Sequence, residues 1–203
     1  YVDNNFIARS VEIMKHDTVE MGISIPMKIL ILGNNNSGKK TLIKCIENKT
    51  RRVGDSNLYS CVFKSKEFYI EIWSSGDESR KRLSENEFYK DSDVALILFS
   101  LPDQDGFDSI DYWTSKLKKY SGTDIPPIML IGNKVDLITG GNIKTGHVSG
   151  DDVVSITSGI AEGLGVSSHP IGLIRTILNR CDSVDVILEL ISEIGDIKKS
   201  YTN

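Results

Sequence analysis

The chain has 203 residues, which is enough for one well-packed domain. Hydrophobic residues make up 39% and charged residues 26%, an ordinary balance for a globular protein. The formal net charge of −4 provides no general basic field for nucleic acid, and no apolar run reaches transmembrane length. Composition therefore argues against a nucleic-acid-binding protein and against a membrane-spanning one.

Three cysteines, Cys45, Cys61 and Cys181, are widely spaced and odd in number. This pattern fits neither a disulfide framework nor the ligand spacing of a metal site. We therefore expect three buried thiols in a reducing compartment.

The first clear core strand begins near residue 27, so residues 1–25 are interpreted as an N-terminal extension and residues 26–203 as the domain. A start at Tyr1 is consistent with an excerpt from a longer protein. Met27–Leu32 is a short apolar run of buried-strand type. Residues 41–47 follow as a helix with an apolar face.

Between that strand and helix, Gly33–Lys39 matches G-x-x-x-x-G-K, the pattern of a phosphate-binding loop. Its glycines allow a tight turn and close backbone approach to phosphate oxygens, and Lys39 would reach the β- and γ-phosphates. The pattern should continue with Ser or Thr, but Lys40 stands there and Thr41 follows. The alternative is an Asn- and Gly-rich turn in an ordinary α/β protein. The predicted phosphate site comprises Gly33, Asn36, Ser37, Gly38, Lys39, Lys40 and Thr41.

Strands and helices alternate along the rest of the chain. Further strands are predicted over 58–64, 67–73, 94–99, 128–131 and 171–174, and helices over part of 74–87 and over 106–120, 151–164 and 183–199. Ser65-Lys66 is predicted to turn a hairpin that adds one antiparallel edge strand, and residues 136–150 are expected to form a loop. The alternation predicts an α/β fold, a mostly parallel six-stranded sheet with helices on both faces.

A second motif, Asn133-Lys134-Val135-Asp136, directly follows the 128–131 strand. Ligands of open α/β sheets bind beyond the carboxyl ends of the strands, where the glycine loop also lies. A carboxylate can accept hydrogen bonds from the N1–H and 2-amino group of guanine, which adenine does not offer. We therefore predict that Asp136 reads the base, with Lys134 lying along it. The alternative is a turn formed by Asn133 and Asp136.

With these two motifs the chain resembles the Ras superfamily of small GTPases, and most closely its Rab branch, over roughly residues 28–199. Further segments are similar to Rab sequences: Glu71-Ile72-Trp73, Phe88-Tyr89-Lys90-Asp91-Ser92-Asp93, residues 103–113 and Val184-Asp185-Val186-Ile187. The resemblance implies the P-loop small-GTPase fold, GDP or GTP as ligand, Mg²⁺ beside the phosphates and a role in vesicle trafficking. It also implies that Leu178 and Asn179, at the place of the last guanine motif, complete the base site.

Departures from the family pattern cluster at the metal and the γ-phosphate. Lys40 replaces the family's Mg²⁺-binding Ser or Thr, and Ser74 replaces the aspartate that follows the tryptophan of the third strand. Counted without a gap, the family's glycine and glutamine become Asp77 and Glu78. A one-residue gap would instead align Gly76 with that glycine, at the expense of the match at Phe88-Tyr89.

We therefore predict a guanine-nucleotide-binding Rab-like domain with weak or absent GTP hydrolysis. Carboxylates of Asp77 and Glu78 would repel the γ-phosphate, and the Lys40 ammonium would partly replace Mg²⁺. The sequence leaves open that these charges are solvated while Thr41 or water serves the metal. No catalytic residue is assigned beyond Glu78 at the usual glutamine position.

Two other functions stay open, a nucleotide-free pseudo-GTPase interaction module and a slow conventional GTPase. Protein effectors or regulators are expected to bind through Asn48–Asn57 and Ser74–Tyr89. The chain ends without a cysteine motif for prenylation, so no membrane anchor is visible in it. We expect a cytoplasmic protein whose membrane association, if any, depends on a missing segment or a partner.

Overall fold

A seven-stranded sheet organises the part of the chain that the computed structural model describes. That part comprises residues 26–63, 65–76, 82–121, 125–134, 136–139, 171–176, 181 and 184–202. The strand order is β2-β3-β4-β1-β5-β6-β7. The bounds are β1 (Met27–Leu32), β2 (Arg51–Arg52), β3 (Leu58–Phe63), β4 (Lys66–Ser74), β5 (Val94–Ser100), β6 (Ile128–Asn133) and β7 (Ile171–Thr176). Neighbouring strands from β4 to β7 are parallel, and β2 and β3 run antiparallel at one edge.

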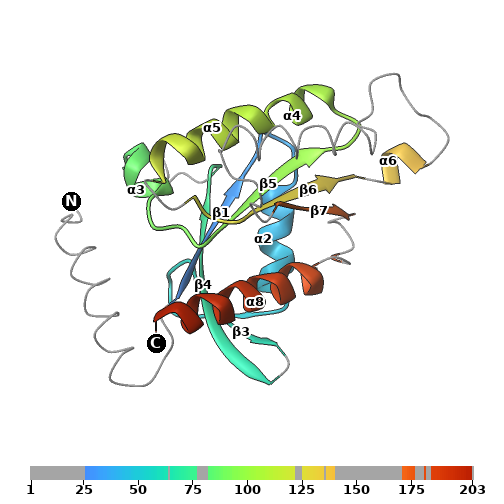
Figure 1. Cartoon of the computed structure of the whole chain (residues 1–203). Coiled ribbons are helices and arrows are strands. Elements are labelled where there is room, and N and C mark those ends of the chain that lie inside the picture. Colours follow the sequence, from blue (N-terminus) through green and yellow to red (C-terminus); the bar gives the residue numbers. More distant parts are fainter. Residues whose placement is uncertain are drawn as a thin grey trace.

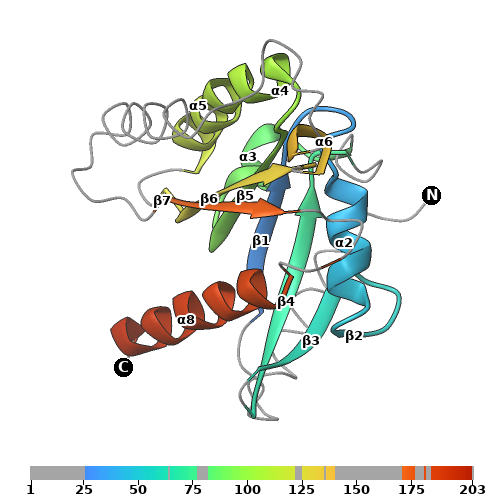
Figure 2. The same cartoon turned by 90° about the vertical axis from the view of Figure 1, so that its right-hand side faces the viewer.

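Helices cover both faces of this sheet (Figures 1 and 2). One face carries α2 (Lys39–Glu47) and α8 (Val184–Thr202), and the other carries α3 (Glu85–Tyr89), α4 (Gln104–Asp108) and α5 (Ile110–Tyr120). The short helix α6 (Asp136–Thr139) follows β6. Among the described helices, none has the length and apolar character needed to span a bilayer.

Side-chain alternation in β1 explains how one strand contributes to two cores. Ile29 and Ile31 point toward α2 and α8, whereas Leu30 and Leu32 point toward α3 to α5. Every residue of β5 is buried, as expected for a central parallel strand covered on both faces. The carboxyl ends of β1 and β6 therefore lie at the same edge of a rigid sheet.

The predicted α/β fold is confirmed, with local differences. The sheet gains the two-residue strand β2, because the exposed Arg51 and Arg52 pair with Tyr59 and Ser60 inside a stretch that the sequence marks only as polar. The helix expected over 106–120 is two helices that meet at Ser109, whose hydroxyl donates to the Gly106 carbonyl at 2.7 Å. The helix expected over 151–164 lies outside the described residues.

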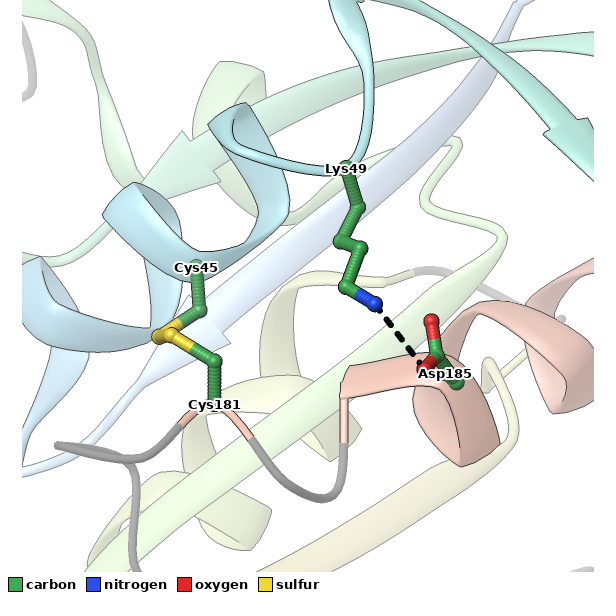
Figure 3. The surroundings of a disulfide bond; sticks show 4 residues. All are labelled: Cys45, Lys49, Cys181 and Asp185. Atoms are coloured by element: carbon green, nitrogen blue, oxygen red, sulfur yellow. Dashed lines mark hydrogen bonds and ion pairs between the residues drawn. A yellow bond between two sulfur atoms is a disulfide. The ribbon is translucent and has the colours of Figure 1, made fainter.

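The expectation of three free thiols is wrong for two of the cysteines. Cys45 of α2 and Cys181, just before α8, form a disulfide with their Cα atoms 5.4 Å apart (Figure 3). Because α2 and α8 pack on the same face of the sheet, the fold brings together residues separated by 136 positions, which chain spacing does not reveal. Cys61 is a buried free thiol, and burial raises its pKa to about 12.

Candidate nucleotide site

The glycine loop connects the end of β1 to the start of α2. Gly33 (φ 142°) and Gly38 (φ 112°) both have backbones in the region that favours glycine, and Asn36 adopts a left-handed conformation (φ 63°). A Cβ on Gly33 would overlap the carbonyl oxygen of Leu98 in β5. The loop is therefore pressed against the neighbouring strand, and its first glycine is required by close packing as well as by its dihedral angle.

Lys39 begins α2 and is buried against this loop, with 8% of its surface exposed. Its ammonium donates to the carbonyls of Gly33 (2.6 Å) and Asn34 (2.7 Å). No side chain caps the first turn of α2, and that turn contains no acidic residue. The lysine, the loop backbone and a helix N-terminus thus present positive potential at one place, which is the arrangement that binds phosphate.

The guanine motif is joined directly to the loop. Asn133, the last residue of β6, is buried, and its side-chain amide donates to the Ser37 carbonyl at 3.0 Å. Lys134 has a left-handed backbone (φ 65°), and Asp136 is exposed at the start of α6. Sequence reasoning placed both motifs at one edge of the sheet, but the bond between Asn133 and Ser37 has no sequence signal.

Ser37 contains an unusual polar atom. Its side chain is 3% exposed, and its hydroxyl has no hydrogen-bond partner among the described residues. A Cβ on Gly33 would lie 2.8 Å from this oxygen. The loop therefore contains one buried hydroxyl whose bonding capacity the described protein atoms leave unused.

The chain leaving β4 passes over the phosphate-loop lysine. A Cβ on Gly76 would lie 3.2 Å from Cε of Lys39, and the Gly76 N–H donates to the Ser74 hydroxyl at 3.4 Å. Ser75 continues the contact, since its N–H donates to the Ile31 carbonyl at 3.0 Å. The Ser75 hydroxyl also donates to the Gly33 carbonyl at 3.5 Å, so both Ser75 and Gly76 lie against the loop. Asp77 and Glu78 lie outside the described residues.

Further along the chain, α3 is anchored to β1. The Ser84 hydroxyl and Glu87 form a capping box at the N-terminus of α3. The Lys28 ammonium donates to the carbonyls of Glu87 (3.0 Å) and Lys90 (2.7 Å) and lies 4.5 Å from the centre of the Trp73 ring. Burial lowers the pKa of Lys28, against the opposing effect of nearby carboxylates. The segment over 82–90 is therefore fixed at its C-terminal end.

Lys40 and Ser74 stand at the places where the family pattern puts groups near the metal, and Thr41 directly follows Lys40. Lys40 is exposed and Thr41 is half-buried. Ser74, at the place of the family's aspartate, is a buried residue whose hydroxyl accepts the Gly76 N–H. No group of three or more His, Cys, Asp or Glu side chains in the described part of the chain is placed to hold a metal ion. An ammonium has no lone pair for a cation, so Lys40 does not fit Mg²⁺ in the manner that the family pattern implies, whereas the hydroxyls of Thr41 and Ser74 are oxygen donors.

A glycine loop between a central parallel strand and a helix, beside a second motif at the end of another parallel strand, defines an α/β protein of the P-loop class. A profile of the Ras family matches residues 28–160, and the chain belongs to this family. Family membership implies guanine-nucleotide binding and typically Mg²⁺. Leu178 and Asn179, predicted at the base site, lie outside the described residues.

Curated relatives point to the Rab branch. Ras-related protein Rab-19 of Rattus norvegicus is 26% identical over 127 residues, which is 59% of this chain and 58% of the relative. Ras-related protein RABG1 of Arabidopsis thaliana is 26% identical over 124 residues, 56% of this chain and 61% of the relative. Ras-related protein Rab-26 of Rattus norvegicus is 25% identical over 120 residues, 55% of this chain and 46% of the relative. The chain thus spans less than two thirds of the length of each, and it contains a Rab-like small GTPase domain.

Proposed function

We propose that this domain binds GDP or GTP and hydrolyses GTP weakly or not at all. The observation that supports it best is the contrast around Lys39. The lysine, loop backbone and Asn133 are joined into one hydrogen-bonded unit, whereas the position of the family's metal-supporting aspartate is a buried serine. The groups that would bind the phosphates are held together, whereas Lys40 and Ser74 replace the family's groups at the metal.

In this proposal the phosphates lie on the loop and the start of α2, and the base lies beyond β6. The Lys39 ammonium would keep its loop carbonyls or exchange one of them for a β-phosphate oxygen. Asp136 would accept the guanine N1–H and 2-amino group, with Lys134 beside the ring. The complete proposed set is Gly33, Asn36, Ser37, Gly38, Lys39, Lys40 and Thr41 for phosphate, and Asn133, Lys134, Asp136, Leu178 and Asn179 for guanine.

Nucleotide retention is proposed to depend little on Mg²⁺. Lys40 carries a positive charge at the start of α2, next to the lysine that is directed into the loop, and its side chain is exposed. Two unit charges about 4 Å apart at a protein surface interact by about 4 kcal/mol. An ammonium near the β-phosphate would therefore supply part of the stabilisation that a metal ion gives in the family.

Chelation tests this proposal. Release of fluorescently labelled GDP is measured with and without EDTA for the wild type, Lys40→Ser and, as a matched control, Lys44→Ser, which removes an exposed lysine of the same helix. We expect EDTA to change the release rate of the wild type and of Lys44→Ser by less than about twofold. Rapid EDTA-driven release from the wild type would contradict substitution of the metal by Lys40.

Weak hydrolysis is proposed from the segment after β4. The Gly76 N–H donates to the Ser74 hydroxyl, and a carboxylate stands at the family's glutamine position in either register, Glu78 without the gap and Asp77 with it. Losing groups that position water and spread transition-state charge costs orders of magnitude in rate. Single-turnover hydrolysis by the wild type and by Lys39→Ala distinguishes this proposal from a slow conventional GTPase, which would show a rate that depends on Lys39. A folded wild type that binds no nucleotide would instead identify a pseudo-GTPase interaction module.

Vesicle trafficking in the cytoplasm is proposed from family resemblance alone. Effectors or regulators would bind Asn48–Asn57, which contains the exposed edge strand β2, and Ser74–Tyr89, which ends in α3. Localisation of the tagged chain tests this role. We expect wild type on vesicle membranes and Lys39→Ala dispersed, and equal distribution of both proteins would argue against it.

A further inference from the structure

The disulfide connects the helix of the phosphate loop to the segment that leads into helix α8. Cys45 lies on α2, the helix that Lys39 begins, and Cys181 lies between β7 and α8. β7 pairs with β6, the strand that ends in Asn133. Figure 3 shows the exposed Lys49–Asp185 ion pair (3.1 Å) beside the disulfide, joining the loop just after α2 to the first turn of α8. A covalent link and an ion pair thus hold the C-terminal end of α2 and the loop after it close to the start of α8.

Burial differs between the two sulfur-bearing residues. Cys45 is 2% exposed inside the core cluster, whereas Cys181 is only partly buried at its margin. Of the two residues, Cys181 is therefore the one that a small thiol or disulfide in solution would approach. Such asymmetry suits an exchange reaction in which one sulfur meets the external reagent and the other completes the bond internally.

In the disulfide form, Cys181 has a backbone conformation that reduction would leave free to change. Its φ of 53° is left-handed, a conformation that residues with a Cβ adopt at a cost. Its carbonyl accepts the Val184 N–H at 3.5 Å, at the start of α8. Opening the disulfide removes the covalent constraint on this residue, so the first turn of α8 can relax. The helix itself stays docked, because Val184, Ile187 and Ile191 are fully buried.

We propose that Cys45 and Cys181 form a redox-modification site, with a small-molecule disulfide such as oxidised glutathione as the oxidant, and that the closed form slows nucleotide release by fixing α2 to α8. The Cys181 thiolate attacks glutathione disulfide, forming a mixed disulfide and releasing one glutathione thiolate. The Cys45 thiolate then attacks the Cys181 sulfur and releases the second. Two protein thiols are oxidised, one glutathione disulfide is reduced, and the two thiol protons end on the released glutathione.

The covalent arm of the test uses the whole chain equilibrated with reduced or oxidised glutathione, followed by alkylation and mass spectrometry of unreduced peptides. We expect a peptide pair joined through Cys45 and Cys181 only in the oxidised sample, in the wild type and in Cys61→Ala. Closing so long a loop should raise the melting temperature by about 5–15 °C, an increase absent from Cys181→Ser. An unlinked wild type after oxidation, or equal melting of both redox forms, would overturn the proposal.

The nucleotide arm, which rests on the proposed function, measures release of fluorescently labelled GDP from the oxidised and reduced wild type. We expect release to be at least about fivefold faster after reduction, and unaffected by redox state in Cys181→Ser. Equal rates from a protein with a demonstrated disulfide would overturn control of the site. The mass and melting measurements need no nucleotide, so failure of GDP to bind would count against the proposed function, while those measurements would still decide whether the disulfide forms.

Discussion

Replacing Gly33 with alanine tests the packing of the phosphate loop against the sheet. At φ 142° a residue with a Cβ is strained, and the added methyl group would overlap the Leu98 carbonyl and lie 2.8 Å from the Ser37 hydroxyl. The strain is about 1–2 kcal/mol, and forced overpacking adds about 1–3 kcal/mol. Alanine also lowers the conformational entropy of the unfolded chain, which stabilises the folded state by about 0.4–1 kcal/mol. We therefore expect a net loss of about 1–4.6 kcal/mol in the free energy of unfolding.

Gly54→Ala is the matched control. Gly54 also has a positive φ (64°), but nothing lies within 4 Å of the position that its Cβ would take. Only the dihedral cost remains, so the net loss is about 0–1.6 kcal/mol. Urea unfolding of both variants gives the two free energies directly. If Gly33→Ala is within about 0.5 kcal/mol of Gly54→Ala, the loop does not pack against β5 as closely as the structure indicates.

Three further predictions concern single side chains in and near the site. Ser37→Ala in nucleotide-free protein should leave the free energy of unfolding unchanged or raise it by about 1 kcal/mol, because the buried hydroxyl lacks a partner among the described residues; a clear loss in urea unfolding would reveal an unseen bond. Asn133→Ala should lower stability by about 1–3 kcal/mol, since it leaves the Ser37 carbonyl without this amide, and a loss below about 0.5 kcal/mol would argue against the contact. Burial raises the pKa of the Cys61 thiol from 9.0 to about 12, so the thiol stays protonated in the folded protein over a pH range in which it ionises in the unfolded chain. The wild type therefore loses stability as the pH rises from about 9 to about 12. Relative to Cys61→Ala, the wild type should lose about 1 kcal/mol between about pH 8 and pH 10, and parallel pH profiles would contradict this.

The sequence predicts the framework well because hydrophobic periodicity and glycine spacing are local signals. Met27–Leu32 reads as a buried strand and is one, and the glycine loop and Asn133 occur at strand ends on the same edge of the sheet, as expected. The expected final helix agrees with α8 to within a few residues. These features depend on residues close together in the chain.

What the sequence does not predict depends on contacts between distant segments. The Cys45–Cys181 bond exists because two helices pack on one face, and the Asn133–Ser37 bond because two strand ends share one edge of the sheet. The contact of Gly76 with Lys39 depends on the path of the chain after β4, for which the sequence carries no local signal.

Retention of guanine nucleotide is the central claim, and the nucleotide released from denatured purified protein tests it most directly. Chromatography should find close to one equivalent of GDP or GTP per wild-type chain, and little from folded Lys39→Ala, because that variant lacks the ammonium bound to the Gly33 and Asn34 carbonyls. The same preparation purified in EDTA should retain its nucleotide. An empty, folded wild type that takes up no added GDP or GTP would contradict this claim and identify the domain as an interaction module.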